Sequence, residues 1–296
     1  MRALGIDTSN YTTSAAVFDG SGGYNAGRLL EVRPGELGLR QSDALFQHIK
    51  HLPGRFAELQ AEGWLTGLSA VGASTRPGEG QGRTLADALG VPFYAVSHQQ
   101  GHIAAAAWSA GRLELLDRPM LAWHLSGGTT ELLYVEPDGV NVRAQCVGGT
   151  SDISAGQLID RTGVLLGLPF PAGKALDALA SKSGPVRGFP VKLNGLTFSL
   201  SGMENKGKAL AEQGRPPAEI ARFTLETVAS AVRRATDAAR KRWPGLPVLC
   251  SGGVASNRLL RTVMSDAAFA APQYSTDNAM GAAILAWRSL RQEAEA

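Results

Sequence analysis

Two stretches of this sequence share a pattern of strand, polar turn and strand, and this repetition constrains the fold more than any other feature. In the first stretch, apolar runs at residues 3–7 and 14–19 flank a hydroxyl-rich turn. In the second, apolar runs at residues 121–125 and 131–135 flank the turn 126–130. Each pattern predicts a hairpin with a polar tip. The two copies share negligible sequence identity, so the pattern alone predicts two lobes of similar design.

Strands and helices alternate along the rest of the chain, which is typical of an α/β protein. We place the break between lobes near residues 117–119. The first lobe then comprises residues 1–117 with the C-terminal helix 279–296, and the second comprises residues 118–278. Candidate core positions lie in two of the predicted helices: Leu45, Ile49, Leu52 and Phe56 in the first, and Phe223, Val228, Ala231 and Ala235 in the longest. Further strands are predicted at residues 68–74, 93–96 and 247–250, a glycine-rich loop at 75–82, and helices at 39–59, 83–89, 98–110, 148–167, 174–180, 220–243, 258–269 and 279–291.

Composition excludes several classes of protein. Of the 296 residues, 44% are hydrophobic and 19% are charged, which is ordinary for a globular chain and argues against long disorder. No run of 18 uncharged apolar residues occurs, so no membrane span is predicted. Asp7 interrupts the short apolar N-terminal run, which therefore resembles a strand rather than a signal peptide, and we expect a cytoplasmic protein. Cys146 and Cys250 lie in apolar or glycine-containing surroundings and are predicted to be buried thiols.

Three of the five histidines occupy positions that suit a metal site. His98 and His102 are four residues apart, about one helical turn, so a helix starting here would point both imidazoles the same way. His124 directly precedes the turn 126–130. A divalent metal takes convergent imidazoles, usually completed by a carboxylate, and Asp277 at the head of the last predicted helix is a candidate. An ordinary helix cap is the alternative role for Asp277.

Three turns suit the binding of a phosphate or nucleotide. The first, with Thr8 and Ser9, offers hydroxyls and backbone amides at a hairpin tip. In the second, Ser126, Gly127 and Gly128 let backbone N–H groups approach an anion, because glycine has no Cβ to obstruct it. The third, at Gly252 and Gly253, ends a strand and opens a helix. Two hairpin turns followed by a strand–turn–helix predict a nucleotide held by two related lobes. Neither GxxxxGK[ST] nor GxGxxG occurs.

A set of short motifs follows in a fixed order along the chain: Gly5-Ile6-Asp7-Thr8-Ser9, His98-x3-His102, Ser126-Gly127-Gly128, Gly156-Gln157-Leu158-Ile159-Asp160-Arg161, Leu166-Gly167-Leu168-Pro169-Phe170-Pro171, Phe198-Ser199-Leu200-Ser201-Gly202, Gly252-Gly253-Val254-Ala255-Ser256-Asn257 and Thr276-Asp277-Asn278. This ordered set resembles the TsaD family, which older usage calls the glycoprotease or O-sialoglycoprotein endopeptidase family. The resemblance runs from residue 5 to about residue 285.

The resemblance implies the two-lobed actin/Hsp70/sugar-kinase fold. It also implies a metal- and nucleotide-dependent transferase that moves threonylcarbamoyl from threonylcarbamoyl-AMP to a tRNA adenosine, and partner subunits of a modification complex. One iron or zinc ion would be held by His98, His102 and Asp277, the expected catalytic residues, with His124 where some relatives have a tyrosine. An adenine nucleotide (AMP, ATP or the acyl-adenylate) would contact Asp160, Gly173 and Asn257. The metal would polarise the carbamoyl or phosphate oxygens as a Lewis acid.

Several positions depart from the family pattern and imply a divergent paralogue. Tyr11 and Thr12 stand where the family usually has an acidic pair, and Gln157 stands where it usually has glutamate. The acceptor is therefore open between tRNA and another amine or hydroxyl. A non-catalytic nucleotide-binding scaffold is a further alternative, although a scaffold has no need of the histidines. A metalloprotease is disfavoured, because Gln99 replaces the glutamate base of HExxH.

Overall fold

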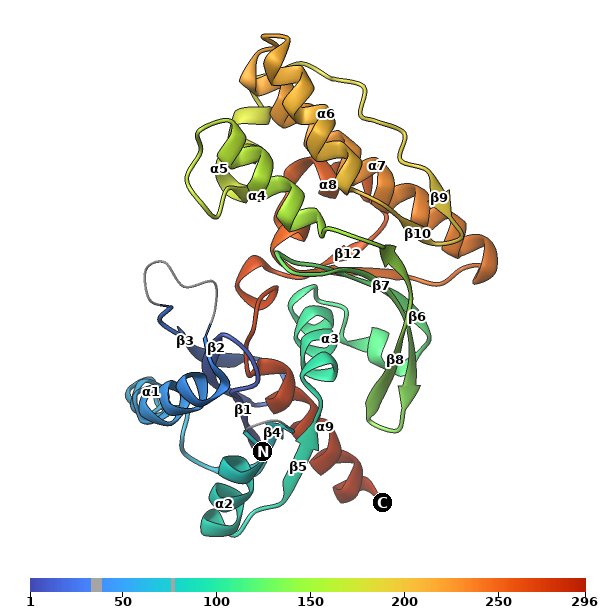
Figure 1. Ribbon diagram of the computed structural model, residues 1–296. Helices are drawn as coiled ribbons and strands as arrows, with labels where there is room; N and C mark the ends of the chain where they lie inside the picture. Colours follow the sequence, from blue (N-terminus) through green and yellow to red (C-terminus); the bar gives the residue numbers. More distant parts are fainter. Residues whose placement is uncertain (33–38, 76–77) are drawn as a thin grey trace. The chain divides into compact units, whose positions relative to one another are not determined.

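The computed structural model describes residues 1–32, 39–75 and 78–296 and divides into two compact units (Figure 1). Unit 1 comprises Met1–Asp117, Pro137–Arg143 and Asp277–Ala296. Unit 2 comprises Arg118–Glu136 and Ala144–Thr276. Within the described residues, no helix combines the length and apolar character needed to cross a membrane.

Unit 1 is built on a five-stranded sheet in the order β3-β2-β1-β4-β5. Strands β1, β2 and β3 are antiparallel to one another in turn, whereas β4 and β5 extend the sheet in parallel with β1. Its elements are β1 (Arg2–Asp7), β2 (Thr12–Phe18), β3 (Gly23–Leu29), α1 (Gln41–Ala61), β4 (Leu68–Ser74), α2 (Glu79–Leu89), β5 (Phe93–Val96), α3 (His98–Ser109), a 3-10 turn (Leu113–Asp117) and α9 (Met280–Glu295).

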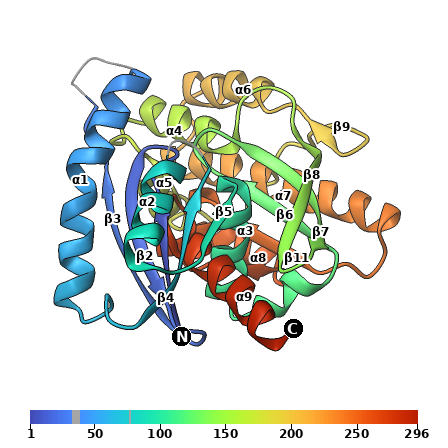
Figure 2. The same cartoon turned by 90° about the horizontal axis from the view of Figure 1, so that it is seen from below.

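Alternate residues of β1 face opposite sides of this sheet, and each side is covered by helices. Leu4 and Ile6 belong to the core on the α1 and α2 side, and Figure 2 shows α1 running along β2 and β3. On the other side α9 packs on Ala3 and Gly5. A Cβ at Gly5 would lie 2.3 Å from the carbonyl oxygen of Ala279, so only glycine permits this approach of the C-terminal helix.

Helix α1 confirms only part of the predicted core: Leu52 is buried and Phe56 packs against the core, as predicted. Leu45 and Ile49 are exposed, whereas His48 is buried together with Leu52 and Leu59. The physical reason is that His48 has a partner in the sheet, since its Nδ1 lies 2.8 Å from the Thr13 hydroxyl. A hydrogen-bonded imidazole can be buried at little cost, and the helix is rotated accordingly.

Unit 2 is built on a seven-stranded sheet in the order β12-β11-β6-β7-β8-β10-β9. Its elements are β6 (Met120–Leu125), β7 (Thr130–Asp138), β8 (Asn141–Thr150), α4 (Ala155–Leu165), α5 (Gly173–Ala180), β9 (Leu193–Asn194), β10 (Thr197–Phe198), α6 (Ser201–Glu212), α7 (Pro217–Arg242), β11 (Val248–Ser251), a 3-10 turn (Gly253–Ser256), α8 (Arg258–Val263), β12 (Ala268–Phe269) and a second 3-10 turn (Pro272–Tyr274). The tip of the β7–β8 hairpin, Pro137–Arg143, belongs to unit 1.

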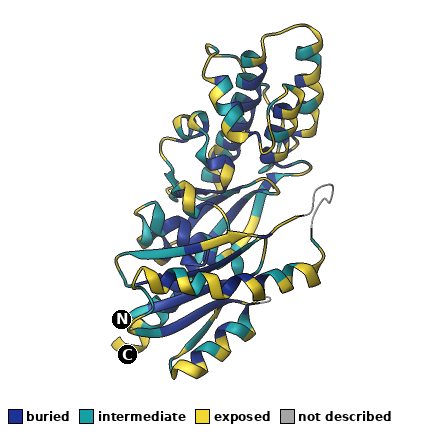
Figure 3. Ribbon diagram, turned by 90° about the vertical axis from the view of Figure 1, so that its left-hand side faces the viewer, coloured by how far each residue is buried: buried dark blue, intermediate teal, exposed yellow. Residues whose placement is uncertain are grey.

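The core of unit 2 lies between the central strands and the long helix α7. Trp123 on β6 is fully buried, and its indole N–H donates to the hydroxyl of Thr236 on α7 over 2.8 Å. Val228, Ala231 and Ala235 of α7 are buried as predicted, while Phe223 is only partly buried. Burial is concentrated in the strands and on the helix faces turned toward them (Figure 3).

The two predicted hairpins are confirmed as the antiparallel pairs β1–β2 and β6–β7. The sequence missed β3, β8 and α6. The helix predicted at 148–167 begins only at Ala155, because residues 148–150 end β8. The helix predicted at 258–269 ends at Val263 and is followed by a short strand. Helix α2 begins inside the predicted glycine-rich loop, of which residues 76–77 lie outside the described part. Cys250 is buried as predicted, but Cys146, on β8, is exposed.

Candidate metal centre

Helix α3 presents two histidines on one face from its first residues onward. Ser97 caps the helix: its hydroxyl accepts from the backbone N–H of Gln100, and the Gln100 side chain accepts from the backbone N–H of Ser97. This capping box fixes the first turn, in which His98 is the first helical residue. His102 then follows one turn later, as predicted from the spacing.

A close crossing of α3 and α9 brings a third side chain to these histidines. A Cβ on Gly281 would lie 1.8 Å from the carbonyl oxygen of Gly101, so the two backbones touch where both residues are glycine. Gly101 sits between the two histidines, and Asp277 precedes Gly281 by four residues. The crossing therefore sets the carboxylate of Asp277 beside both imidazoles.

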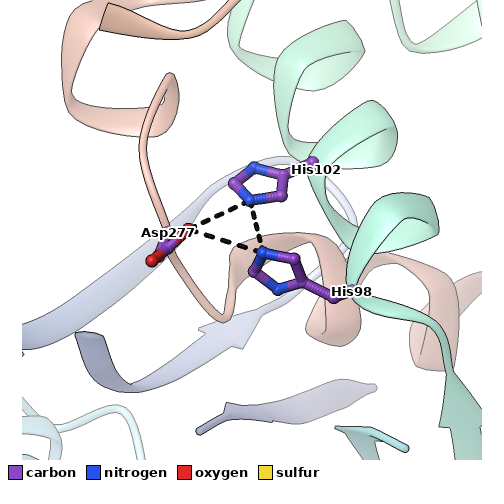
Figure 4. A group of neighbouring side chains, drawn as sticks. All are labelled: His98, His102 and Asp277. Carbon is purple, nitrogen blue, oxygen red and sulfur yellow. Dashed lines mark hydrogen bonds and ion pairs between the residues drawn. The ribbon is translucent and has the colours of Figure 1, made fainter. Parts of the chain in front are cut away.

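The three side chains converge on a small space (Figure 4). His98 Nε2 and His102 Nε2 are 2.9 Å apart. Asp277 Oδ1 lies 3.2 Å from His102 Nε2 and 3.4 Å from His98 Nε2. The N-cap residue of α9 is Ala279, and the side chain that accepts from the backbone N–H of Met280, the first residue of this helix, is that of Asn278. Asp277 is therefore not the cap, and the helix-cap alternative is wrong.

Asp7 at the end of β1 orients the His98 ring through a contact with its Nδ1. Its Oδ2 lies 2.9 Å from His98 Nδ1, while its Oδ1 accepts hydrogen bonds from the Ser9 backbone N–H and the Ser74 hydroxyl. The Ser9 hydroxyl donates to the same oxygen and lies 2.6 Å from His98 Nδ1. An ionised carboxylate at Nδ1 selects the tautomer with the proton on Nδ1, which leaves the Nε2 lone pair directed toward His102 and Asp277.

The charges around His98 favour a positive species at this place. Burial works against a charged imidazole, but the hydrogen bonds with Asp277 and Asp7 outweigh it and raise the pKa of His98 to about 10. Burial alone would raise the pKa of Asp277, yet its contacts with His102 and His98 lower it well below its usual range. Asp7 and Asp277 thus both favour positive charge at His98.

The donor set and its dimensions fit a divalent transition metal. Two imidazole nitrogens and one carboxylate oxygen lie 2.9–3.4 Å apart. Ligands about 2.0–2.1 Å from one ion are separated by roughly 3 Å, so the three atoms match the spacing of a coordinated set. Nitrogen and oxygen donors of this kind suit zinc or iron rather than calcium or magnesium.

The fourth predicted ligand, His124, lies on β6 in unit 2, where it pairs in register with Glu131 of β7 and Ser251 of β11. Among the described residues, the group of possible ligands contains only His98, His102 and Asp277. A role for His124 as a ligand stays a prediction.

The predicted nucleotide residues of unit 2 lie at the ends of strands and helices. The Ser126 hydroxyl accepts from the backbone N–H groups of Gly128 and Thr129, which closes the turn. A Cβ on Gly127, Gly128 or Gly253 would meet no described atom within 4 Å, so open space borders these backbones. Gly252 is different: its φ is +93°, and a Cβ there would lie 2.1 Å from the Leu125 carbonyl oxygen, so this glycine serves packing.

Two further predicted nucleotide residues already have protein partners. Asp160 Oδ1 accepts from the backbone N–H of Ala172, which precedes Gly173 at the start of α5. Asn257 caps α8 through its carbonyl oxygen, and its amide donates to Asp177 over 2.8 Å. Thr8, predicted to face a phosphate, is buried, and its hydroxyl has no hydrogen-bond partner within the described part of the chain.

Sequence reasoning missed Asp7 and Ser74 as parts of the centre. The signal for Asp7 was present, since an acidic residue ends a buried strand directly before two hydroxyl residues. Ser74 ends β4, the parallel neighbour of β1, and the ends of such neighbours meet at one edge of the sheet. Nothing in the sequence pairs these two strands.

Comparison with known proteins shows which family this sequence matches. The sequence model of the family "TsaD: tRNA N6-adenosine threonylcarbamoyltransferase" matches residues 66–284. The chain belongs to this family. The tRNA N6-adenosine threonylcarbamoyltransferase of one Thermus thermophilus strain is 35% identical, over 97% of this chain and 93% of that protein. The protein of the same name from Granulibacter bethesdensis is 33% identical, over 98% and 88%.

Solved structures confirm the fold of this TsaD-family chain. Full-length HypF in a phosphate- and nucleotide-bound form matches all of this chain and 56% of its own, with a TM-score of 0.63 and 14% identity. The (R)-2-hydroxyglutaryl-CoA dehydratase component A of Acidaminococcus fermentans matches 98% and 99%, with a TM-score of 0.58 and 14% identity. The predicted two-lobed actin/Hsp70/sugar-kinase fold is therefore confirmed.

Proposed function

We propose that this protein transfers a threonylcarbamoyl group from threonylcarbamoyl-AMP to the exocyclic amine of a tRNA adenosine, with one iron or zinc ion held by His98, His102 and Asp277. The observation that carries the proposal is the convergence of these three side chains, from segments about 175 residues apart, in a chain that belongs to a family of such transferases. Because the acceptor in this proposal is tRNA, we expect the activity in the cytoplasm. We also expect paralogous subunits as further partners.

The reaction is an acyl transfer whose atoms balance simply. The amine nitrogen bonds to the carbamoyl carbon, the bond from that carbon to the AMP phosphate oxygen breaks, and the amine loses a proton to solvent. A bound metal ion supplies Lewis acidity toward the carbamoyl or phosphate oxygens. Asp7 holds His98 in the tautomer that leaves Nε2 available. Asp277 supplies the negative charge that keeps a cation in place.

The adenylate is assigned to unit 2. Open space beside Gly127, Gly128 and Gly253 supports the approach of an anionic group to their backbones. Asp160, Gly173 and Asn257 belong to α4, α5 and the start of α8, where the family pattern predicts ribose and base contacts. Asp160 keeps one carboxylate oxygen that takes no part in its bond to Ala172. A contribution of Thr8 and Ser9, in unit 1, to the adenylate site stays a prediction.

The decisive experiment combines metal analysis with a transfer assay. Purified protein is expected to carry about one iron or zinc per chain and, with threonylcarbamoyl-AMP and unmodified tRNA, to form threonylcarbamoyladenosine detectable by mass spectrometry of nucleosides. His102→Ala is expected to lose both metal and activity. His51→Gln, on α1 and outside the cluster, is the matched control and is expected to keep both.

The same assay separates the alternative functions. Metal and adenylate binding without tRNA modification, in the presence of the partner subunits, would rule out the tRNA acceptor and favour another amine or hydroxyl. Adenylate binding with no metal in any preparation would favour a scaffold. Restoration of threonylcarbamoyladenosine in a strain unable to make it would confirm the tRNA acceptor.

A further inference from the structure

A cavity lies in unit 1 beside the metal centre. It has a volume of about 480 Å³, within the range of small-molecule sites. Its lining comes from the β1–β2 turn, the end of β3 and the start of α1: Thr8, Ser9, Asn10, Tyr11, Leu30, Leu39, Gln41, Ala44, Leu45 and His48. We call this space the α1 cavity.

The α1 cavity and the metal centre share a wall. Ser9 lines the cavity, and its hydroxyl lies 2.6 Å from Nδ1 of His98 and also contacts Asp7. The backbone of this wall is held in place, since Tyr11 accepts a hydrogen bond from the Leu30 backbone N–H. A molecule in the α1 cavity therefore lies one residue away from the imidazole that would hold the metal.

The described lining of the α1 cavity carries no formal charge. Its residues are hydroxyls, amides, aliphatic side chains, one tyrosine and one histidine, with no lysine, arginine, aspartate or glutamate. Burial lowers the pKa of His48 below its usual value, so this imidazole is neutral near pH 7. Among the described lining residues, a phosphate or carboxylate would find no cation, and an ammonium group would find no anion.

An uncharged flat group with hydrogen-bonding edges suits such a lining. Asn10 and Gln41 offer amide N–H groups that can donate to the ring nitrogens of adenine, which leaves its exocyclic amine free. Tyr11 offers an aromatic ring that is 44% exposed, and Leu45 and Leu39 offer apolar surface. Bases read from single-stranded RNA loops are bound by this combination of stacking and edge contacts.

We propose that the α1 cavity receives the acceptor adenine base, extruded from the tRNA loop, and presents its exocyclic amine to the metal centre. The inference rests on the proposed function and adds the site of the acceptor. Tyr11 is then a specificity-determining residue that supports the base by stacking. The enzyme takes the base out of its stack, as enzymes that modify bases generally do.

Two stem–loop RNAs test the proposal on the metal-loaded protein by fluorescence anisotropy. One carries adenosine at the acceptor position and the other an abasic site. Wild-type protein is expected to bind the adenosine RNA at least about tenfold more tightly, the scale of one base–aromatic stack. Leu45→Trp fills the cavity and is expected to abolish this preference, as is Tyr11→Ala, whereas Tyr11→Phe is expected to keep most of it.

Phe46→Trp is the matched control, because Phe46 is the next residue of α1, is exposed and does not line the cavity. It is expected to behave as wild type. Equal binding of the two RNAs by wild type, or an undiminished preference in Leu45→Trp, would overturn the proposal. A protein that binds adenosine RNA selectively but transfers no threonylcarbamoyl would contradict the proposed function instead. Normal transfer by Leu45→Trp would contradict the base site alone.

Discussion

Gly281 lies against Gly101 so closely that a methyl group at position 281 would come within 1.8 Å of the Gly101 carbonyl oxygen. The helices α3 and α9 cross at this point, and the crossing sets Asp277 beside His98 and His102. The absence of a side chain at Gly281 thus determines the geometry of a centre to which this residue contributes no ligand.

Gly281→Ala is therefore expected to damage both stability and the metal centre. The two backbones must separate, at a cost of about 1–3 kcal/mol or more of unfolding free energy. Chemical denaturation and metal analysis of the purified variant measure the two effects. Gly80→Ala is the control, because a Cβ there meets no described atom within 4 Å and alanine favours the helix. Wild-type metal content in Gly281→Ala would show that the crossing does not control the centre.

Asp7→Asn is expected to weaken metal binding by roughly 10- to 100-fold, the usual effect of losing an outer carboxylate. The amide keeps the shape of the side chain but no longer selects the His98 tautomer or stabilises positive charge on its ring. Competition with a zinc chelator measures the affinity. Asp19→Asn, at a turn after β2 and outside the cluster, is the matched control. Equal affinities for both variants and wild type would contradict the role of Asp7.

Thr236→Val is expected to lower the unfolding free energy by about 1–3 kcal/mol. The change leaves the buried indole N–H of Trp123 without its acceptor, and an unsatisfied buried donor bears its full desolvation penalty. Urea denaturation measures the loss. Thr236→Ser keeps the hydroxyl and is expected to recover most of it, so equal losses in the two variants would point to packing alone.

Asp152 makes the stability of unit 2 depend on pH in acid. Burial alone would raise its pKa, but the Ser199 and Ser201 side chains and the backbone N–H groups of Leu200 and Ser201 hold it well below its usual range. The carboxylate thus stabilises the start of α6 above its unfolded pKa of about 4. This contribution is complete above about pH 5 and is lost as the pH falls below about 4.

Asp152→Asn is expected to be less stable than wild type at pH 6, by an amount that shrinks as the pH is lowered toward 3. Denaturation curves at several pH values, for both proteins, measure this difference. A difference independent of pH would show that the carboxylate contributes no charge-dependent stabilisation.

The site was predictable where the chemistry is local. His98 and His102 share one helical turn, and their spacing alone predicts a common direction. Asp277 depended on family resemblance, because 175 positions separate it from His102 and its local role looked like that of a helix cap. Asp7 was missed for the same reason: it meets His98 only through the sheet.

The fold was predictable where hydrophobic periodicity is strong, and the prediction failed where this periodicity is weak. Strand β3 contains two glycines and an asparagine, and it forms because β2 offers it an edge. Helix α1 has two apolar faces, and the sequence favoured the one with Leu45 and Ile49. The partner of His48, Thr13, decides which face is buried, and no local pattern reveals a partner on another strand.

By itself, the sequence determined the two hairpins, the α/β alternation and the histidine pair, because each depends on residues close together in the chain. Only the tertiary structure decided which carboxylates meet the histidines, which face of α1 is buried, and that a cavity whose described lining carries no formal charge adjoins the centre at Ser9. These depend on contacts between distant segments, and the contacts follow from close packing at Gly5 and Gly281, where the absence of a side chain is what matters.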